Sequence, residues 1–123
     1  MRGVRSKDTS IELIIRRALF RAGYRYRLHV KKLPGAPDIV FPGRKKVIFV
    51  HGCFWHQHEG CSRAKFPASN TDYWMPKLRR NADRDRNALK ALQRMGWKSL
   101  VIWECELTRL EQAIKKTIRF LER

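Results

Sequence analysis

The fold is decided by residues 46–56, which read KVIFVHGCFWH. The first half of this stretch is an apolar, β-branched and aromatic run, typical of a buried strand. A second apolar run at residues 38–41 precedes it, and the turn residues 42–44 (PGR) join the two runs. We therefore expect neighbouring strands of one sheet, followed by a long irregular segment from Gly52 to Asn70 that is too long to be an idle loop.

On both sides of this stretch the sequence alternates between helical and strand patterns. The patterns predict helices over 10–22, 75–95 and 107–121, and further strands over 24–30 and 99–103. A capping box from Thr9 to Glu12 opens the first helix, and Leu110 is the first apolar position of the last helix expected to face the core. This order predicts one α/β domain over residues 1–123, with a mixed central sheet flanked by helices.

Basic residues dominate the charge of the chain. In 123 residues, 28 Lys+Arg against 11 Asp+Glu give a formal net charge of +17, which implies a polyanionic partner such as nucleic acid. The alternatives are a surface made basic for solubility, which normally needs less charge, and a membrane surface, which would need the basic residues on one helix face. No apolar run approaches the roughly 18 residues of a membrane span, and the N-terminus lacks a secretory signal. We expect a soluble cytoplasmic protein with no membrane partner.

Three cysteines and one histidine have the spacing of a metal site. Cys53, His58 and Cys61 form a C-x4-H-x2-C motif, and Cys105 follows the predicted strand 99–103. An odd number of cysteines in a short cytosolic chain argues against disulfides, and a Cys3His set suits tetrahedral Zn2+. Because the loop is poor in aliphatic residues, a structural zinc would staple it. The alternative is that the cysteines are small buried apolar residues and His58 is exposed.

Three carboxylates stand where the pattern favours apolar residues. Asp38 opens an apolar strand, Asp85 lies on the buried stripe of the second helix, and Glu12 shares the apolar face of the first helix. A buried carboxylate needs a cation, which indicates a metal or a basic partner. The alternatives are a turn residue for Asp38, an arginine partner for Asp85 and a capping box for Glu12.

Two histidines, His51 and His56, lie just past the strand that neighbours Asp38. Beside a hard ion such as Mg2+ at Asp38, one imidazole could take a proton from water, and the other could orient or neutralise a phosphate. An ion with protein, water and phosphate oxygens as ligands is what phosphodiester cleavage requires. The alternative is that both histidines are ordinary polar loop residues.

Aromatic residues are concentrated in and beside the same loop. They are Phe54, Trp55, Tyr73 and Trp74, and the basic residues Arg63, Lys65, Lys77, Arg79 and Arg80 flank them. Rings among phosphate-seeking cations are typical of proteins that stack on bases or wedge between them. The alternative is core packing, which we expect for Tyr73.

The order and spacing of these motifs resemble a known family. The motifs are PDIVF at 37–41, VIFVHGCFWH at 47–56, residues 81–86 and WEC at 103–105. They resemble the very-short-patch-repair (Vsr) DNA mismatch endonucleases from about Lys7 to the C-terminus. The resemblance implies a type II restriction-endonuclease-like fold. It also implies a Mg2+-dependent nick in one strand of duplex DNA, 5′ to the thymine of a T·G mismatch left by deamination of 5-methylcytosine.

The resemblance further implies roles for individual residues. Asp38 and the backbone carbonyl of Val50 would hold Mg2+, and His56 would be the general base. The residues that support the metal waters and the phosphate would be His51, Asp85 and Glu12. The wedge that enters the DNA would be Phe54, Trp55 and Trp74, and the Zn2+ ligands would be Cys53, His58, Cys61 and Cys105. From its charge, we expect Lys77 to contact the DNA backbone.

The sequence departs from related patterns at two points. Val50 stands where some family members have threonine, which matters little for a backbone carbonyl ligand. The acidic-x-Lys pair of the wider nuclease fold is absent after Asp38, because the strand ends in Val50-His51. This absence suits the family and argues against a generic restriction-enzyme mechanism.

Three functions remain open from the sequence: a mismatch-nicking endonuclease, a nickase of different specificity linked to restriction–modification, and a zinc-stapled DNA-binding module. A mere binder has no need for the converging Asp38, Asp85 and two loop histidines. No second half-site module is visible, so we expect a monomer that acts on double-stranded DNA at the bacterial nucleoid. Mismatch-repair proteins are candidate partners.

Overall fold

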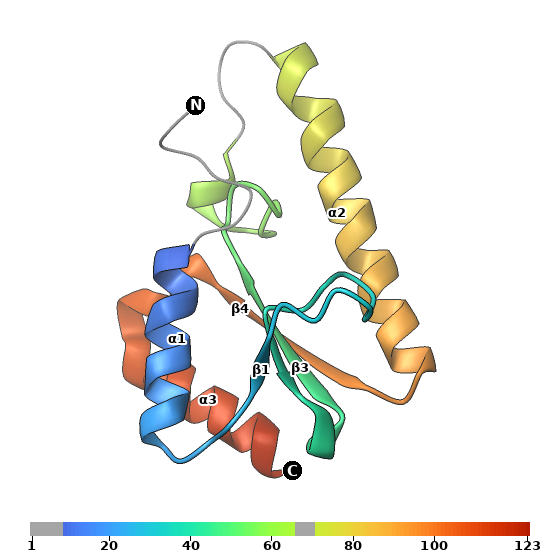
Figure 1. Cartoon of the computed structure of the whole chain (residues 1–123). Helices are drawn as coiled ribbons and strands as arrows, with labels where there is room; N and C mark the ends of the chain where they lie inside the picture. Colours follow the sequence, from blue (N-terminus) through green and yellow to red (C-terminus); the bar gives the residue numbers. More distant parts are fainter. Residues whose placement is uncertain (1–8, 66–70) are drawn as a thin grey trace.

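The chain folds around a four-stranded mixed sheet, seen in a computed structural model that describes residues 9–65 and 71–123 (Figure 1). The strands are β1 (Arg27–Leu28), β2 (Ile39–Phe41), β3 (Lys46–His51) and β4 (Lys98–Trp103), in the spatial order β1-β2-β3-β4. β1, β2 and β3 pair antiparallel, whereas β4 lies parallel to β3. The predicted mixed sheet is therefore confirmed.

Helices flank the sheet on both sides, as predicted. α1 (Thr9–Arg21) and α3 (Leu110–Glu122) lie together on one side, and the long helix α2 (Thr71–Arg94) lies on the other (Figure 1). Short 3-10 helices span Pro42–Arg44, Ser62–Ala64 and Glu104–Arg109. Within the described ranges, no helix is both long enough and apolar enough to cross a membrane.

Strand β3 joins the two layers of the core, because all of its residues are buried. Successive side chains of a strand point to opposite faces of the sheet. Ile48 and Val50 pack in the cluster under α1 and α3, whereas Val47 and Phe49 pack in the cluster that includes Leu92 of α2. A strand covered on both faces reads as a continuous apolar run, which is why the sequence identified β3 to the residue.

Lys46 is the charged exception in this buried strand. Its ammonium group donates to the main-chain carbonyls of Phe120, Leu121 and Arg123, at 2.7, 3.0 and 2.8 Å. Carbonyls at a helix C-terminus have no helical donor, and the helix dipole favours a cation there. Lys46 therefore attaches the end of α3 to the start of β3.

The first predicted strand is shorter in the structure than the sequence indicated. The strand expected over 24–30 is reduced to Arg27–Leu28, and the next residue, His29, has a positive φ of 49°. A left-handed residue turns the chain out of the extended conformation, so the strand ends there. The side chain of Thr9, and with it the expected capping box, lies outside the described residues.

The later helices also begin elsewhere than predicted. α2 starts at Thr71 and contains Pro76, which the sequence placed in the first turn. The last helix was expected from residue 107, but residues 104–109 form a 3-10 helix instead. Leu110 is 38% exposed, so the prediction that it faces the core was wrong. The 3-10 segment changes the helical phase at this point, and the apolar face starts later, at Ala113.

Candidate active site

The centre of the site is Asp38, just before β2, at the end of the sheet where β3 finishes. The backbone N–H of Val50 donates to Asp38 Oδ2 at 2.7 Å, and Asp38 is only 8% exposed. Both residues line a cavity of about 390 Å³ that also reaches His51, His56 and Asp85. The antiparallel β2–β3 pairing thus places the carboxylate beside the end of β3, as the adjacent apolar runs predicted.

Two histidines and an aspartate also line this cavity. The rings of His51 and His56 are stacked, with centroids 3.7 Å apart and planes 5° from parallel. His56 Nδ1 lies 2.6 Å from Asp85 Oδ2, so α2 supplies a carboxylate that holds this ring in place. Burial and, secondarily, the neighbouring His56 lower the pKa of His51 to about 4. The His51 ring is therefore neutral at pH 7, even though Asp85 opposes this shift.

Glu12 lies behind Asp38 and does not line the cavity. Its carboxylate is buried, with Oε2 3.1 Å from Arg16 Nη1 and 2.9 Å from His29 Nε2. His29 Nδ1 is in turn 3.8 Å from Asp38 Oδ1. The imidazole ring of His29 therefore lies between Glu12 and Asp38, two of the three carboxylates that the sequence analysis selected.

Sequence reasoning missed His29. The signal that could have found it is the register of β1 and β2, because Leu28 pairs with Ile39 and the next pair in an antiparallel ladder is His29 with Asp38. The N–H of His29 donates to the main-chain carbonyl of Asp38 at 3.1 Å. The short strand β1 thus positions a residue of the site.

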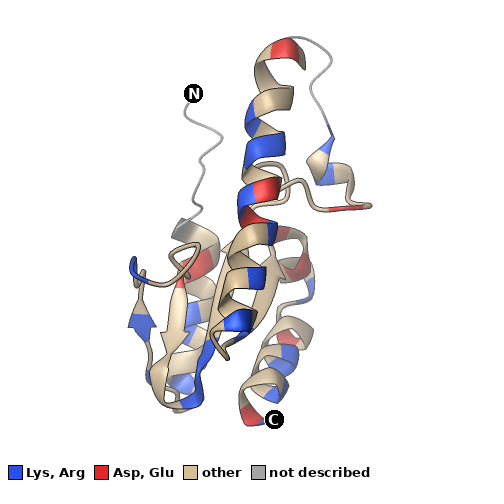
Figure 2. Cartoon of the chain, turned by 90° about the vertical axis from the view of Figure 1, so that its right-hand side faces the viewer, with Lys and Arg blue, Asp and Glu red and all other residues tan. Residues whose placement is uncertain are grey.

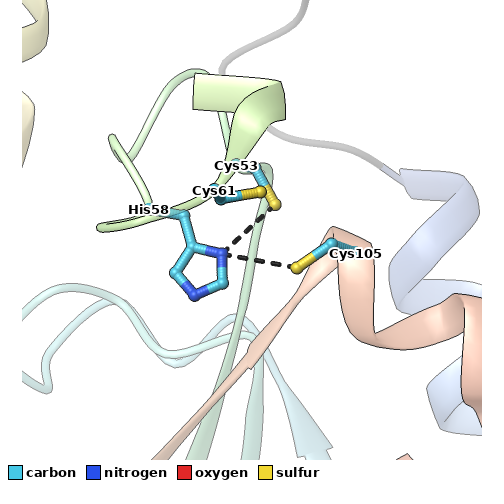
Figure 3. A group of neighbouring side chains, drawn as sticks. All are labelled: Cys53, His58, Cys61 and Cys105. Carbon is cyan, nitrogen blue, oxygen red and sulfur yellow. Dashed lines mark hydrogen bonds between the residues drawn. The ribbon is translucent and has the colours of Figure 1, made fainter. Parts of the chain in front are cut away.

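The three cysteines converge with His58 at the base of the loop, as their spacing predicted (Figure 3). The Nδ1 atom of His58 is 3.6 Å from Cys53 Sγ and 3.4 Å from Cys105 Sγ. One ligand atom from each of the four residues lies within 4.8 Å of the others, so the cluster could hold a metal ion. Burial raises the pKa of the Cys53 thiol to about 12, so its thiolate needs a cation beside it.

The cluster joins the loop to the end of β4. His58 stacks on Trp103, the last residue of β4, with ring centroids 4.0 Å apart. Trp103 also contacts His51 edge-on, at 5.1 Å between centroids. The loop that carries His56 is therefore fixed to the sheet through its own side chains, and a metal ion at the cluster would strengthen the attachment.

The aromatic residues of the loop and of α2 form one cluster. Phe54, Trp55 and Trp74 meet edge to face, with centroids 5.4–5.7 Å apart, and all three are half-buried. The indole N–H of Trp55 is buried and has no hydrogen-bond partner among the residues the structure describes. Tyr73 is 56% exposed, so the prediction that it packs in the core was wrong. Lys77 lies above its ring, 4.7 Å from the centroid.

Lys and Arg residues recur along α2, which faces the viewer in Figure 2. They include Lys77, Arg79, Arg80, Arg84 and Arg86. Arg84 lines the cavity itself, next to Asp85. A positive surface beside a carboxylate and two imidazoles suits a substrate that carries phosphate groups.

Comparisons with known proteins agree with this chemistry. Residues 1–63 match the family described as DNA mismatch endonuclease Vsr. The type II nicking enzyme V.XorIIP of Xanthomonas oryzae pv. oryzae is 53% identical over 110 residues, which cover 89% of this chain and 80% of that protein. The DNA mismatch endonuclease Vsr of Escherichia coli is 42% identical over 107 residues, which cover 87% of this chain and 68% of that protein.

A third relative is also a nicking enzyme. The type II nicking enzyme V.NmeAIP of Neisseria meningitidis is 44% identical over 104 residues, which cover 85% of this chain and 74% of that protein. The chain therefore belongs to the Vsr family of DNA mismatch endonucleases.

Proposed function

We propose that this protein nicks one strand of duplex DNA 5′ to the thymine of a T·G mismatch and so starts very short patch repair. The observation that carries the proposal is the single cavity in which Asp38 faces the stacked pair His51–His56, with Asp85 bonded to His56. Two residues of the aromatic cluster, Phe54 and Trp55, lie on the loop that carries His56, and the third, Trp74, lies on α2. We further propose a type II restriction-endonuclease-like fold and a monomer that acts in the bacterial cytoplasm.

The oxygens near Asp38 fit a hard divalent ion. Asp38 and the carbonyl of Val50 would hold Mg2+, because both residues line the cavity and Val50 is fixed against the Asp38 carboxylate. When Mg2+ is bound, its charge offsets the negative charge that develops on the phosphate in the transition state. Glu12, behind Asp38, would orient waters of the ion.

His56 is suited to be the general base. Asp85 Oδ2 would accept a hydrogen bond from Nδ1–H of His56, which leaves Nε2 able to take a proton from the attacking water. His51, neutral at pH 7, would offer the scissile phosphate a hydrogen bond rather than a charge. Because the two rings are stacked, the general base and the hydrogen-bond donor to the phosphate would lie side by side in the cavity.

The experiment that tests this function is a nicking assay on two matched duplexes, one with a T·G pair and one with T·A at the same position. With Mg2+ present, we expect a single nick 5′ to the mismatched thymine and little cleavage of the T·A duplex. With the chelator EDTA, neither duplex should be cut. Equal cleavage of both duplexes, or cleavage in EDTA, would contradict the proposal.

A second candidate function is a nickase whose sequence context matches a restriction–modification system. The observation that favours it is that relatives such as V.XorIIP are called type II nicking enzymes. The two candidates differ in the bases around the mismatch, so the assay should be repeated with the T·G pair in different flanking sequences. Activity confined to one flanking sequence would favour this second function.

We propose zinc as the metal at the cluster of Cys53, His58, Cys61 and Cys105. A tetrahedral Zn2+ with bonds of about 2.3 Å to sulfur and about 2.0 Å to nitrogen separates these ligands by about 3.5 Å. The observed Sγ–Nδ1 distances of 3.6 and 3.4 Å match this value. Because all four positions would be protein ligands, the ion would be structural.

We expect Cys105→Ser to lose zinc and to lower the melting temperature by at least about 10 °C, because the loop that carries His56 is no longer tied to β4. The nicking rate should fall together with the melting temperature. The measurements are the zinc content of the purified protein and its thermal unfolding. Ser62→Ala, a change in the same loop outside the ligand set, is the control. A wild-type protein without zinc would contradict the assignment.

We propose that Phe54, Trp55 and Trp74 enter the base stack beside the mismatch, where a weaker pair costs less to unstack. The unpaired indole N–H of Trp55 supports this role. Trp55→Ala should therefore reduce nicking of the T·G duplex by about 10-fold and narrow its preference over the T·A duplex.

The control for this prediction is Lys77→Ala. Lys77 lies on α2, about one turn after Trp74 of the aromatic cluster. Loss of a phosphate contact should weaken binding of both duplexes equally and reduce the salt dependence of binding. Cleavage ratios on the two duplexes provide the comparison. An unchanged mismatch preference in Trp55→Ala would assign its ring to the protein core instead.

A further inference from the structure

Glu12, His29 and Asp38 form a third group of potential ligands, separate from the cysteine cluster and from the group of His51, His56 and Asp85. Each supplies one ligand atom, and these atoms lie within 4.8 Å of one another. We propose that His29 completes a metal site with the two carboxylates, and that this nitrogen-containing site binds a first-row transition ion such as Mn2+ in preference to Mg2+. The proposal rests on the proposed nuclease function, because Asp38 belongs to both sites.

The first argument is the position of the imidazole ring. His29 Nε2 is 2.9 Å from Glu12 Oε2, and Nδ1 is 3.8 Å from Asp38 Oδ1. The three residues come from α1, from the end of β1 and from the start of β2, so the sheet and α1 together create the convergence. The ring of His29 is about one-third exposed, which leaves the group accessible to an ion and its waters.

The second argument is an unsatisfied carboxylate oxygen. The side chain of Glu12 is 3% exposed, and Arg16 and His29 both approach its Oε2 atom. Its Oε1 atom is buried and has no hydrogen-bond partner in the described part of the chain. A buried carboxylate oxygen without a partner is costly, so a ligand is expected there. A cation shared with Asp38 would satisfy it.

The third argument is the backbone of His29. Its φ of 49° lies in the left-handed region, which costs energy for a residue other than glycine. The bond from its N–H to the carbonyl of Asp38 holds the residue in this conformation. Strained residues that the surrounding structure keeps in place are concentrated at functional sites. Here the strain keeps an imidazole between two acids.

The chemistry of the ligand set indicates the class of ion. Sites made only of carboxylate, carbonyl and water oxygens suit Mg2+, whereas an imidazole nitrogen raises the affinity for first-row transition ions. Mn2+ accepts both carboxylate oxygens and imidazole nitrogen. Arg16 neutralises part of the negative charge of Glu12. A divalent cation is therefore sufficient to neutralise the charge that remains on Glu12 and Asp38.

The test is a titration of the zinc-loaded full chain with Mn2+ in the absence of DNA. Binding is followed by the decrease of the free Mn2+ signal in electron paramagnetic resonance. We expect His29→Gln to weaken Mn2+ binding at least about 10-fold, with little change in the affinity for Mg2+ measured by competition. His51→Gln is the matched control, because it makes the same change in the group of His51, His56 and Asp85, and it should bind Mn2+ within two-fold of wild type.

Two results with the variants would overturn the proposal. One is Mn2+ binding by His29→Gln within two-fold of wild type, which would leave His29 as an ion-pair partner of Glu12. The other is a loss of Mn2+ binding in His51→Gln alone, which would move the ion to the group of His51, His56 and Asp85. Pulsed resonance of wild-type protein with Mn2+ adds a measurement that needs no variant, because it should detect a directly bound nitrogen. Absence of that nitrogen would also overturn the proposal.

The same protein samples separate this inference from the nuclease function. Nicking of the T·G duplex with Mg2+ is measured on each variant independently of Mn2+ binding. Mn2+ binding that depends on His29, in a protein that does not nick T·G duplexes, would contradict the proposed function and support the metal site. Mismatch nicking without any His29-dependent binding would contradict the metal site alone.

Discussion

Replacing Asp38 with alanine is expected to reduce nicking of a T·G duplex by at least about 1000-fold, because a metal ligand contributes several kcal/mol to the transition state. DNA binding should be retained or slightly stronger, since the change removes a negative charge close to the phosphate. The measurements are single-turnover nicking with Mg2+ and DNA affinity by a binding assay. Asp83→Ala, an exposed acid on α2 that pairs with Arg86, is the control for loss of a carboxylate.

Asp38 also accepts a hydrogen bond from Val50, so a loss of structure has to be separated from a loss of chemistry. Asp38→Asn keeps an acceptor for the Val50 N–H and removes the charge. We expect this variant to melt close to the wild-type temperature and to be as inactive as Asp38→Ala. Nicking by Asp38→Asn at near wild-type rate would show that the Asp38 carboxylate is not needed for the reaction.

His56→Ala is the second large effect that we expect. Loss of a general base typically lowers the rate by about 100-fold or more, and the defect should be partly relieved at high pH if hydroxide replaces the activated water. Asp85→Asn should give a smaller defect of the same kind, because it removes the negative charge that strengthens the hydrogen bond from His56 Nδ1–H. The measurement is a pH–rate profile of nicking under single-turnover conditions.

The control for this profile is Glu59→Ala, which changes an exposed residue of the same loop. Its rate and pH dependence should match those of wild type. A His56→Ala rate within a few-fold of wild type would move the role of base to His51, the stacked neighbour in the same cavity. Asp85→Asn would then be expected to have little effect as well.

The strands and the metal-ligand cluster were the most predictable parts of this protein. Strand β3 was identified without error because a strand buried on both faces reads as an apolar run, here with Lys46 and His51 only at its two ends. The cysteine cluster was predictable because few other arrangements explain C-x4-H-x2-C in a loop without aliphatic residues. Asp38 and Asp85 were identifiable as charges in apolar patterns, and the structure places both at one cavity.

The features that the sequence did not reveal depend on register and on local geometry. His29 gave no pattern of its own, because its position beside Asp38 follows from the pairing of two very short strands. Leu110 fits a helical pattern but is exposed, because a 3-10 segment precedes it and changes the phase of the helix. Tyr73 was expected in the core, but α2 extends past the sheet at its N-terminal end, where there is no core to join (Figure 1).

The parallel pairing of β3 with β4 has a consequence for folding during synthesis. The crossover between these strands spans residues 52–97 and includes all of α2. Contacts between segments so distant in sequence form slowly, because a long loop must close before they contribute to stability. α1 precedes β3 and can cover one face of it, but as the ribosome releases the chain the other face, which carries Val47 and Phe49, stays exposed to aggregation until α2 follows.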